Sequence, residues 1–535
     1  MPKMWPTKDP YRADRRKFKW HPGKGWGLGF AAAVSLLVCA VAGHTSASAA
    51  ETTAKPFSFE TVREQARALA AREYQPGPGV KIPDFLKNLS YDQYQDIRFR
   101  PEKSPWYRDH LRFDLEFFHP GFIYPDPVSI HLVENGAIST LAFSPQQFDY
   151  GKNQFPEPVP DNLGFSGFRV IYQPSSDHRG SRPEVASFLG ASYFRMVGTR
   201  QRYGSSFRGL AIDTGEPGGE EFPKFVDFWI ERPGAAARYL QCFALLDSPS
   251  CAGAYRLILH PGDSAVIELE ASLFVRKGGR KIGLAPLTSM FLMGKNRTSY
   301  LPDFRPEVHD ADGLLVQASR GERLWRPLVN PPKVHHMHRF AVDGLAGFGL
   351  LQREREFHCY EDLNARYELR PSLWVKPQNN WGPGAVELVE IPSPNEYNDN
   401  IVAYWIPKEK TEAGQELHWT CRLSAMSDGP DEGSLARVVS TRLSPAHDKV
   451  PCRFVLDFSG DCLPALEPNE RVEASAQASR GEIRNLVTEP NEVTGGWRVF
   501  FDLAAEGHEE TKLRVALQES GRPLSETWIY HYQAE

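Results

Sequence analysis

Residues 224–277 read, in four successive runs, KFVDFWIERP (224–233), YLQCFALLD (239–247), YRLILHPG (255–262) and AVIELEASLFVRK (265–277). Apolar and polar residues alternate over much of each run, which is the pattern of a β-strand with one buried face. The turns between the runs contain Gly, Pro, Asp or Ser and leave no room for crossover helices. The stretch therefore predicts neighbouring antiparallel strands.

The same pattern extends in both directions from this stretch. Upstream it includes RFDLEFF (112–118), SIHLVEN (129–135) and GFRVIYQ (167–173), and downstream it continues to about Met426. Strands that recur without intervening helices predict a large antiparallel β-sandwich over residues 50–426. Helices are predicted only near its start, at residues 59–73 and 91–95.

A linker at residues 427–437, which begins SDGPDEG, separates this region from seven further predicted strands. Seven short strands in about a hundred residues indicate an immunoglobulin-like sandwich over residues 438–535. They read RVVSTRL (437–443), CRFVLDFS (452–459), VEASAQA (472–478), GEIRNLVTE (481–489), WRVFFDLA (497–504), TKLRVALQ (511–518) and TWIYHY (527–532).

The composition is that of a globular protein with more than one domain. The chain has 535 residues, of which 41% are hydrophobic and 24% charged, and its net charge is −5. This charge, together with the lack of a long Lys/Arg run in the body of the chain, argues against binding to nucleic acid. The oligomeric state does not follow from the sequence.

The N-terminus is typical of an export signal over residues 1–49. Basic residues from Arg12 to Lys19 precede the apolar run GFAAAVSLLVCAVAG (29–43), and Ala47-Ser48-Ala49 resembles a cleavage site. Export through the general secretory route or the twin-arginine route fits this pattern, and an uncleaved anchor is the alternative.

Six cysteines follow the signal segment: Cys242, Cys251, Cys359, Cys421, Cys452 and Cys462. An even number in an exported protein permits disulfides. Buried free thiols are the favoured alternative, because a domain of this size does not need covalent links for stability.

Residues 303–405 combine many carboxylates with arginines and aromatic side chains. Carboxylates transfer protons, and aromatic faces stack on sugar rings, so this mixture indicates a carbohydrate site with acid/base chemistry. The alternative is a polar sheet surface with structural ion pairs. The candidate acids are Asp310, Asp312, Glu361, Asp362, Glu368, Glu390, Glu396 and Asp399.

No cofactor or metal site is predicted. The chain has no phosphate-binding glycine motif, no nucleophile elbow and no zinc-type cysteine spacing. The run His335-His336-Met337-His338 places only two histidines on one face of a strand, so surface histidines are expected there.

Several segments resemble the periplasmic glucan biosynthesis proteins of the OpgG/OpgD (MdoG/MdoD) family. They are LGASYFR (189–195), RGLAIDT (208–214), GEEFP (219–223), APLTSM (285–290), RPEVHD (305–310), GFGLLQR (347–353), RPS (370–372) and NDNIVA (398–403). The resemblance spans nearly the whole chain after the signal. It implies a galactose-mutarotase-like β-sandwich followed by an immunoglobulin-like domain, in a protein of the periplasm.

The resemblance also implies site residues. The essential carboxylates of the family fall on Asp310 and Asp399, with Tyr367 and Glu396 in support. We expect Asp310 to be the general acid and Asp399 the general base of an inverting reaction. Arg370, Trp374 and Trp381 are expected to bind substrate beside Tyr367 in one groove, with Trp374 as a core residue being the alternative.

Together with the carboxylates and aromatic residues of residues 303–405, the resemblance implies an endo-acting glycoside hydrolase that cleaves β-1,2-glucan with inversion. The competing hypothesis is a non-catalytic protein that binds glucan and assembles with a membrane glucan synthase. The same aromatic and acidic residues would serve both functions.

Overall fold

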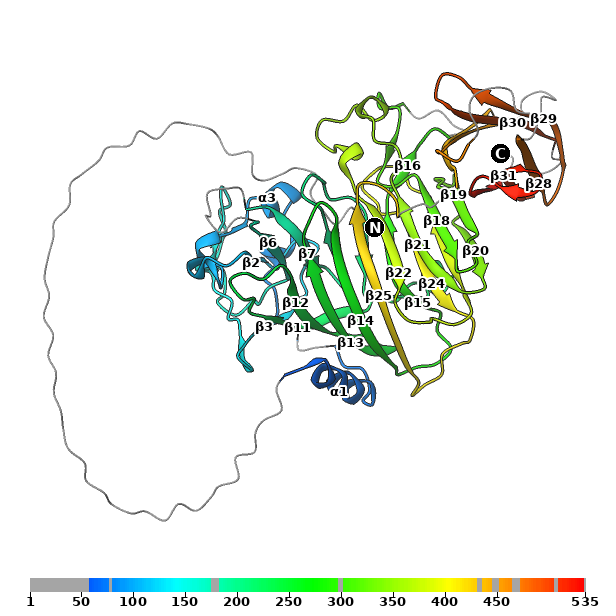
Figure 1. The fold of residues 1–535 in the computed structure, drawn as a ribbon. Helices are drawn as coiled ribbons and strands as arrows, with labels where there is room; N and C mark the ends of the chain where they lie inside the picture. Colours follow the sequence, from blue (N-terminus) through cyan, green and yellow to red (C-terminus); the bar gives the residue numbers. More distant parts are fainter. Residues whose placement is uncertain are drawn as a thin grey trace, which may run out of the picture.

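The computed structural model describes residues 57–76, 79–174, 182–296, 302–430, 435–444, 452–463, 472–504 and 509–533. The predicted signal segment and Cys39 lie outside these residues. Strands dominate the fold (Figure 1), and they form two large sheets, one four-stranded sheet and two two-stranded sheets. The predicted all-β sandwich is therefore confirmed.

The largest sheet has fifteen strands and contains the stretch at residues 224–277. Adjacent strands on its main path are, in order, β28 (Val472–Ala478), β31 (Thr511–Glu519), β33 (Thr527–Tyr532), β19 (Arg323–Pro327), β18 (Gly313–Ala318), β21 (Leu345–Leu351), β22 (Ser372–Pro377), β25 (Glu416–Met426), β14 (Ala265–Val275), β13 (Cys251–His260), β12 (Leu240–Asp247), β11 (Lys224–Glu231), β3 (Ser129–Glu134) and β4 (Ala137–Thr140), while β32 (Arg522–Pro523) pairs with β31. The pairs β11–β3 and β19–β33 are parallel, and the others in this sheet are antiparallel.

The facing sheet has ten strands. Their order is β2 (Phe113–Phe118), β6 (Gly167–Tyr172), β7 (Glu184–Leu189), β8 (Tyr193–Met196), β9 (Ser206–Arg208), β15 (Ile282–Ser289), β24 (Ile401–Pro407), β23 (Gly384–Glu390) and β20 (His336–Val342), with β10 (Leu210–Ile212) paired to β15. Side chains from both sheets, such as Leu287 and Leu269, are buried in one hydrophobic cluster. The two sheets therefore enclose a common core.

Helix α1 (Phe59–Ala70) covers the outer face of the large sheet (Figure 1). Val62 and Ala66 pack there against Phe274 of β14 and Ala254 of β13. Because the helix covers the later part of β14, that part is buried on both faces, while the first part alternates between buried and exposed residues. Two short helices, α2 (Asp84–Lys87) and α3 (Tyr91–Gln95), follow.

The strands after residue 436 fall into two groups, of which only one is a separate sheet. One has four strands in the order β26 (Arg437–Ser444), β27 (Cys452–Ser459), β30 (Gly496–Ala504) and β29 (Glu482–Asn491), and the other is the β28–β31–β33 end of the large sheet. This end is joined by the pairing of Trp325 with Trp528. The division into domains at residues 427–437 stays a prediction, because hydrogen bonds and core contacts both cross it.

Two small sheets complete the fold. One pairs β1 (Arg98–Phe99) with β5 (Phe148–Asp149), and the other pairs β16 (Phe291–Met293) with β17 (Val308–His309). Within the described ranges, no helix is long and apolar enough to cross a membrane. The six cysteines after the signal segment are all free, and four of them are buried.

Candidate active site

Asp310 directly follows the short strand β17, and its position is fixed by backbone pairing. Phe291 of β16 pairs with His309, and the Asp310 N–H donates to the carbonyl of Met290 at 2.8 Å. The residue is only 1% exposed. Its carboxylate forms an ion pair with the guanidinium of Arg370, which is also buried. A buried carboxylate is thus matched by a buried cation, as the low polarity of the surroundings requires.

Asp399 is held against the same stretch of chain. The side chain of Asn400 imitates a strand partner: its Oδ1 accepts from the N–H of Phe291 and its Nδ2 donates to the Phe291 carbonyl, both at 2.9 Å. The carboxylate of Asp399 lies 3.5 Å from the guanidinium of Arg195 on β8. Residues 290–291 therefore position Asp310 from one side and Asp399 from the other.

Tyr367 and Glu396 form the next layer around Asp310. The Tyr367 hydroxyl donates to Glu396 Oε2 at 2.6 Å, and the Arg370 guanidinium lies 4.2 Å from the centre of the Tyr367 ring. Burial, followed by the charges of Asp310 and Glu396, raises the pKa of Tyr367 well above its ordinary value. The phenol therefore keeps its proton and acts as a hydrogen-bond donor.

His309 supports this arrangement from behind. Its Nδ1 lies 2.9 Å from Gln352 Oε1 and its Nε2 lies 3.1 Å from Glu307, while its ring stacks on Phe291. Burial alone would lower the pKa of His309, but Asp312 and Glu307 raise it above its ordinary value. The imidazole thereby fixes the β16–β17 pair that carries Asp310.

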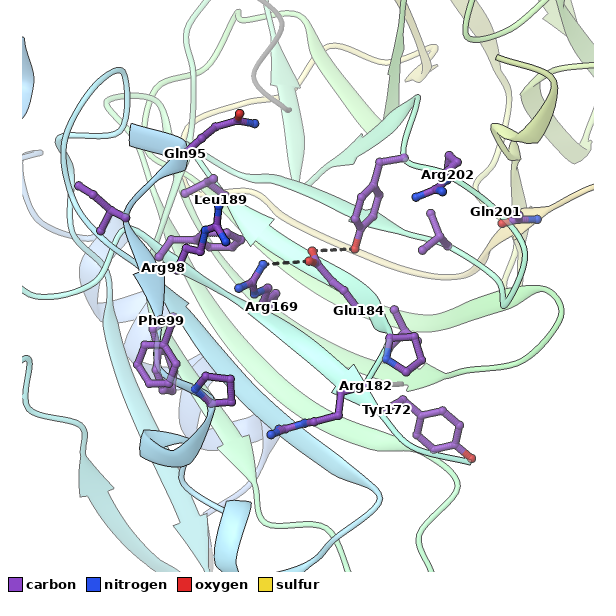
Figure 2. Close-up of a pocket in the computed structure, with 18 of the residues that line it drawn as sticks. Gln95, Arg98, Phe99, Arg169, Tyr172, Arg182, Glu184, Leu189, Gln201 and Arg202 are labelled. Carbon is purple, nitrogen blue, oxygen red and sulfur yellow. Dashed lines mark hydrogen bonds and ion pairs between the residues drawn. The ribbon is translucent and has the colours of Figure 1, made fainter. Parts of the chain in front are cut away.

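A cleft of about 1360 Å³, of which Figure 2 is a close-up, reaches this group at Arg370. Neither Asp310 nor Asp399 lines it, but Arg370 and Tyr124 do. Tyr124 is close enough to Asp399 and Arg195 for both charges to affect its pKa, which burial chiefly raises. The cleft therefore reaches the partners of both carboxylates.

The wall of the cleft is rich in cations. Seven arginines line it: Arg98, Arg100, Arg169, Arg182, Arg200, Arg202 and Arg370. Glu184, which also lines the cleft, accepts from the Tyr203 hydroxyl at 3.0 Å and from Arg169 at 3.3 Å, as the dashed lines of Figure 2 mark. Burial raises the pKa of Glu184, and Arg169 opposes this shift. Such a surface offers many N–H donors to a hydroxyl-rich ligand.

Comparison with known proteins identifies the family. The model of the periplasmic glucan biosynthesis protein MdoG matches residues 57–532. The chain belongs to this family.

Curated relatives of both named types are similar over most of their length. A glucans biosynthesis protein G of Rhodopseudomonas palustris (strain BisA53) is 46% identical over 89% of this chain and 94% of its own. A glucans biosynthesis protein G of Ralstonia nicotianae is 43% identical over 89% of this chain and 95% of its own, and a glucans biosynthesis protein D 1 of the same organism is 43% identical over 94% and 96%. The glucan family assignment thus holds for nearly the whole described chain.

Five of the predicted site residues are connected by the hydrogen bonds, ion pairs and ring contacts described above. Asp310, Arg370, Tyr367 and Glu396 form one chain of contacts, and Asp399 joins them through residues 290–291. Arg195 and Tyr124 were missed, because both approach Asp399 from segments that are far from it in the sequence. The segment LGASYFR (189–195) contained Arg195, but nothing local marked that arginine as a partner of a carboxylate.

Trp374 does not lie in the predicted groove. It is buried on the face of β22 that packs against the C-terminal strands, in one hydrophobic cluster with Trp325 and Trp528. The structure therefore places Trp374 in a hydrophobic core, as the alternative expects, while its assignment to substrate binding stays a prediction. Strand alternation decides this, since neighbouring Leu373 and Val375 point into the large sandwich instead.

Trp381 is placed at the wrong end of the strands for the predicted groove. It packs against Trp405 with ring centres 6.4 Å apart, and it precedes Gly384, which pairs with Pro407. Asp399 precedes Ile401, at the other end of β24. Six residues of strand separate these ends by roughly 20 Å, so Trp381 and Asp399 do not share a groove.

The histidine run at residues 335–338 differs from the expectation in part. His338 is buried rather than on the surface, and its ring stacks on that of His531 with centres 3.7 Å apart. His336 and His338 lie 4.0 and 3.9 Å from Glu390. Arg326 already binds Glu390 at 3.0 Å, and with burial it lowers the pKa of His338. The guanidinium of Arg326 thus occupies the carboxylate that a metal ion would need as a ligand, so we do not assign a metal site to this cluster.

Proposed function

We propose that this chain takes part in the biosynthesis of periplasmic glucan by hydrolysing β-1,2-glucan within the chain, with inversion at the anomeric carbon. The observation that carries the proposal is the pair Asp310 and Asp399. Both are buried, both are held against residues 290–291, directly or through a neighbouring residue, and each has a different cationic partner, of which Arg370 lines the large cleft. Two carboxyl groups in different surroundings are what an inverting hydrolase needs.

The surroundings of the two carboxyl groups favour a division of roles. The buried guanidinium of Arg370 pairs with Asp310 and stabilises a carboxylate there over a carboxylic acid. An ionised carboxylate suits the base that activates water. Asp399 has a more distant cation, Arg195, and lies among tyrosines that include Tyr124. We therefore assign Asp310 as base and Asp399 as acid, which reverses the order expected from the sequence.

Leaving-group chemistry tests this division. An aryl glycoside of a β-1,2-gluco-oligosaccharide whose phenol departs without a proton does not need the acid. Asp399→Asn should retain cleavage of this compound while losing cleavage of β-1,2-glucan, and Asp310→Asn should lose both. The opposite pattern would restore the order expected from the sequence.

The competing function is non-catalytic glucan binding in partnership with a membrane synthase. The cation-rich cleft favours it as much as hydrolysis, because its donors would hold a glucan chain without any reaction. Purified mature protein incubated at high loading with linear β-1,2-glucan separates the two functions. If the protein is a hydrolase, the wild-type protein releases shorter oligosaccharides. The variants Asp310→Asn and Asp399→Asn then release none but still bind the glucan. Binding alone predicts intact glucan from the wild-type protein.

A further inference from the structure

Three large apolar side chains stand exposed around the candidate active site. Phe304 is 79% exposed, Leu363 is 77% exposed and Tyr397 is 62% exposed. We call these three residues the rim patch. Folding normally buries such side chains, and an exposed apolar group beside a polar site often marks a place where a ligand binds.

The rim patch comes from three loops that one arginine joins. Arg305 donates to Asp362 at 2.9 Å and to Glu396 at 2.6 Å, and its guanidinium lies 5.8 Å from the centre of the Phe304 ring. Asp362 and Glu396 are the direct neighbours of Leu363 and Tyr397 in the chain. The three residues therefore lie on neighbouring loops, although the sequence from the first to the last covers about 90 residues.

The patch is also connected to the proposed catalytic group. Glu396, which binds Arg305, accepts the hydrogen bond of Tyr367 at 2.6 Å. Tyr367 stacks on Arg370, and Arg370 pairs with Asp310. A continuous series of contacts thus leads from the exposed ring of Phe304 to the buried carboxylate, so the patch lies on the edge of the same site.

The chemistry of the patch fits a sugar better than a protein surface. Two aromatic rings and a leucine offer faces to the C–H groups of a pyranose ring, while the carboxylate of Asp362 and the guanidinium of Arg305 beside them can bond to hydroxyls. Three side chains cover far less area than the roughly 800 Å² that each partner buries in a stable protein–protein interface.

We propose that the rim patch is an outer glucan subsite, in which Phe304 and Tyr397 stack on a glucose unit some distance from the scissile bond. This inference rests on the proposed function, since it takes the same β-1,2-glucan as ligand. Such a subsite would make the protein favour long chains over short ones. Binding energy far from the reacting bond would position the glucan along the cleft.

The double variant Phe304→Ala/Tyr397→Ala tests the subsite in the full mature chain. Titration calorimetry with linear β-1,2-glucan, with Asp399→Asn added to every protein compared so that the glucan stays intact, should show affinity reduced by about tenfold or more. The affinity for the shortest oligosaccharide that still binds should fall little in the double variant, because this ligand does not reach the rim patch. Phe304→Tyr should keep the wild-type affinity, since it retains the ring face.

A matched control is Tyr239→Ala, which removes a half-exposed tyrosine from the β11–β12 connection. It should bind glucan like the wild-type protein. If the wild-type protein and the double variant bind long glucan with equal affinity, the rim patch is not a subsite, while the proposed function stands. This result would be expected if the rim patch docks another protein instead. A wild-type protein that binds no β-1,2-glucan would overturn both.

Discussion

Arg370 connects more of the proposed site than any other residue described above. It pairs with Asp310, stacks on Tyr367 and lines the cleft. Its approach depends on Gly204, where a Cβ would lie 2.8 Å from the Arg370 Cδ. Burial alone would lower the pKa of Arg370, but Asp310 and Tyr367 raise it above its ordinary value. The charge at this position is therefore secured by its neighbours.

Tyr367→Phe isolates one hydrogen bond of the site. The change removes the donor to Glu396 but keeps the ring beneath Arg370. A hydrogen bond to a charged group is worth about 1.5–3 kcal/mol, so kcat/KM on β-1,2-glucan should fall by about 10–100-fold. Glu396 keeps Arg305 as a partner, so the melting temperature should change little. Unchanged kcat/KM would remove Tyr367 from the catalytic group.

Asp114 gives the stability a pH dependence of known sign. Burial raises its pKa from 3.8 to about 6, against hydrogen bonds from Leu115 and Trp106 and the charge of Arg182. Between these two values the folded state binds a proton that the unfolded state lacks, so the stabilisation is complete below about pH 4 and is lost as the pH rises through 6. The loss should approach about 3 kcal/mol, at about 1.4 kcal/mol for each unit of pKa.

Asp114→Asn checks this assignment, because asparagine cannot titrate. Denaturant unfolding of both proteins, followed by tryptophan fluorescence from pH 4 to pH 7, gives the difference in free energy of unfolding. The wild-type protein should lose stability relative to the variant across this range. A difference that stays constant with pH would show that Asp114 is already ionised in the folded protein at pH 4.

At the scale of single residues, the sequence alone left eight candidates for the two catalytic carboxyl groups and could not choose between them. Asp310 and Asp399 were selected by family resemblance, and Trp374 and Trp381 were selected by residue type. Residue type failed because it carries no information on the face or the end of a strand. Arg195 and Tyr124 approach Asp399 from distant parts of the chain, and no local sequence pattern encodes such a contact.

At the scale of elements, alternation of apolar and polar residues predicted the strands well. The run at residues 224–233 corresponds to β11 (Lys224–Glu231), and all seven strands predicted after the linker are present. The predicted helix at residues 59–73 ends earlier, at Ala70. Sheet order was not predictable, since β19 and β33 pair across about 200 residues of sequence.

Gly349 shows how closely two elements meet. A Cβ at this position on β21 would lie 2.2 Å from the carbonyl oxygen of Leu373 and 2.7 Å from the indole of Trp374 on β22. Gly349→Ala should therefore destabilise the fold by about 3 kcal/mol or more, seen as a melting temperature lower by about 5 °C or more. Gly234→Ala is the control, because nothing lies within 4 Å of a Cβ there. Equal melting temperatures of the two variants would contradict the packing of Trp374 on β21.

At the scale of the whole molecule, the C-terminal strands are bound to the large sandwich by charge as well as by packing. The carboxylate of Glu526 pairs with Arg353, and the Arg353 guanidinium stacks 3.5 Å from the centre of the Trp325 ring. Glu526 also accepts from the N–H of Val438 at 2.7 Å. Arg353 follows β21 closely and Asp312 accepts from its N–H, so this junction adjoins the loops that carry the proposed site.

The proton NMR spectrum of a β-1,2-glucan digest, recorded from the first minutes of reaction, tests the central claim most directly. It reports cleavage and the configuration of the new reducing ends together. The wild-type protein should release oligosaccharides whose new ends are first α and only later equilibrate, and neither Asp310→Asn nor Asp399→Asn should release any. Intact glucan at high protein loading, or new ends that are first β, would contradict inverting hydrolysis by this pair of carboxyl groups.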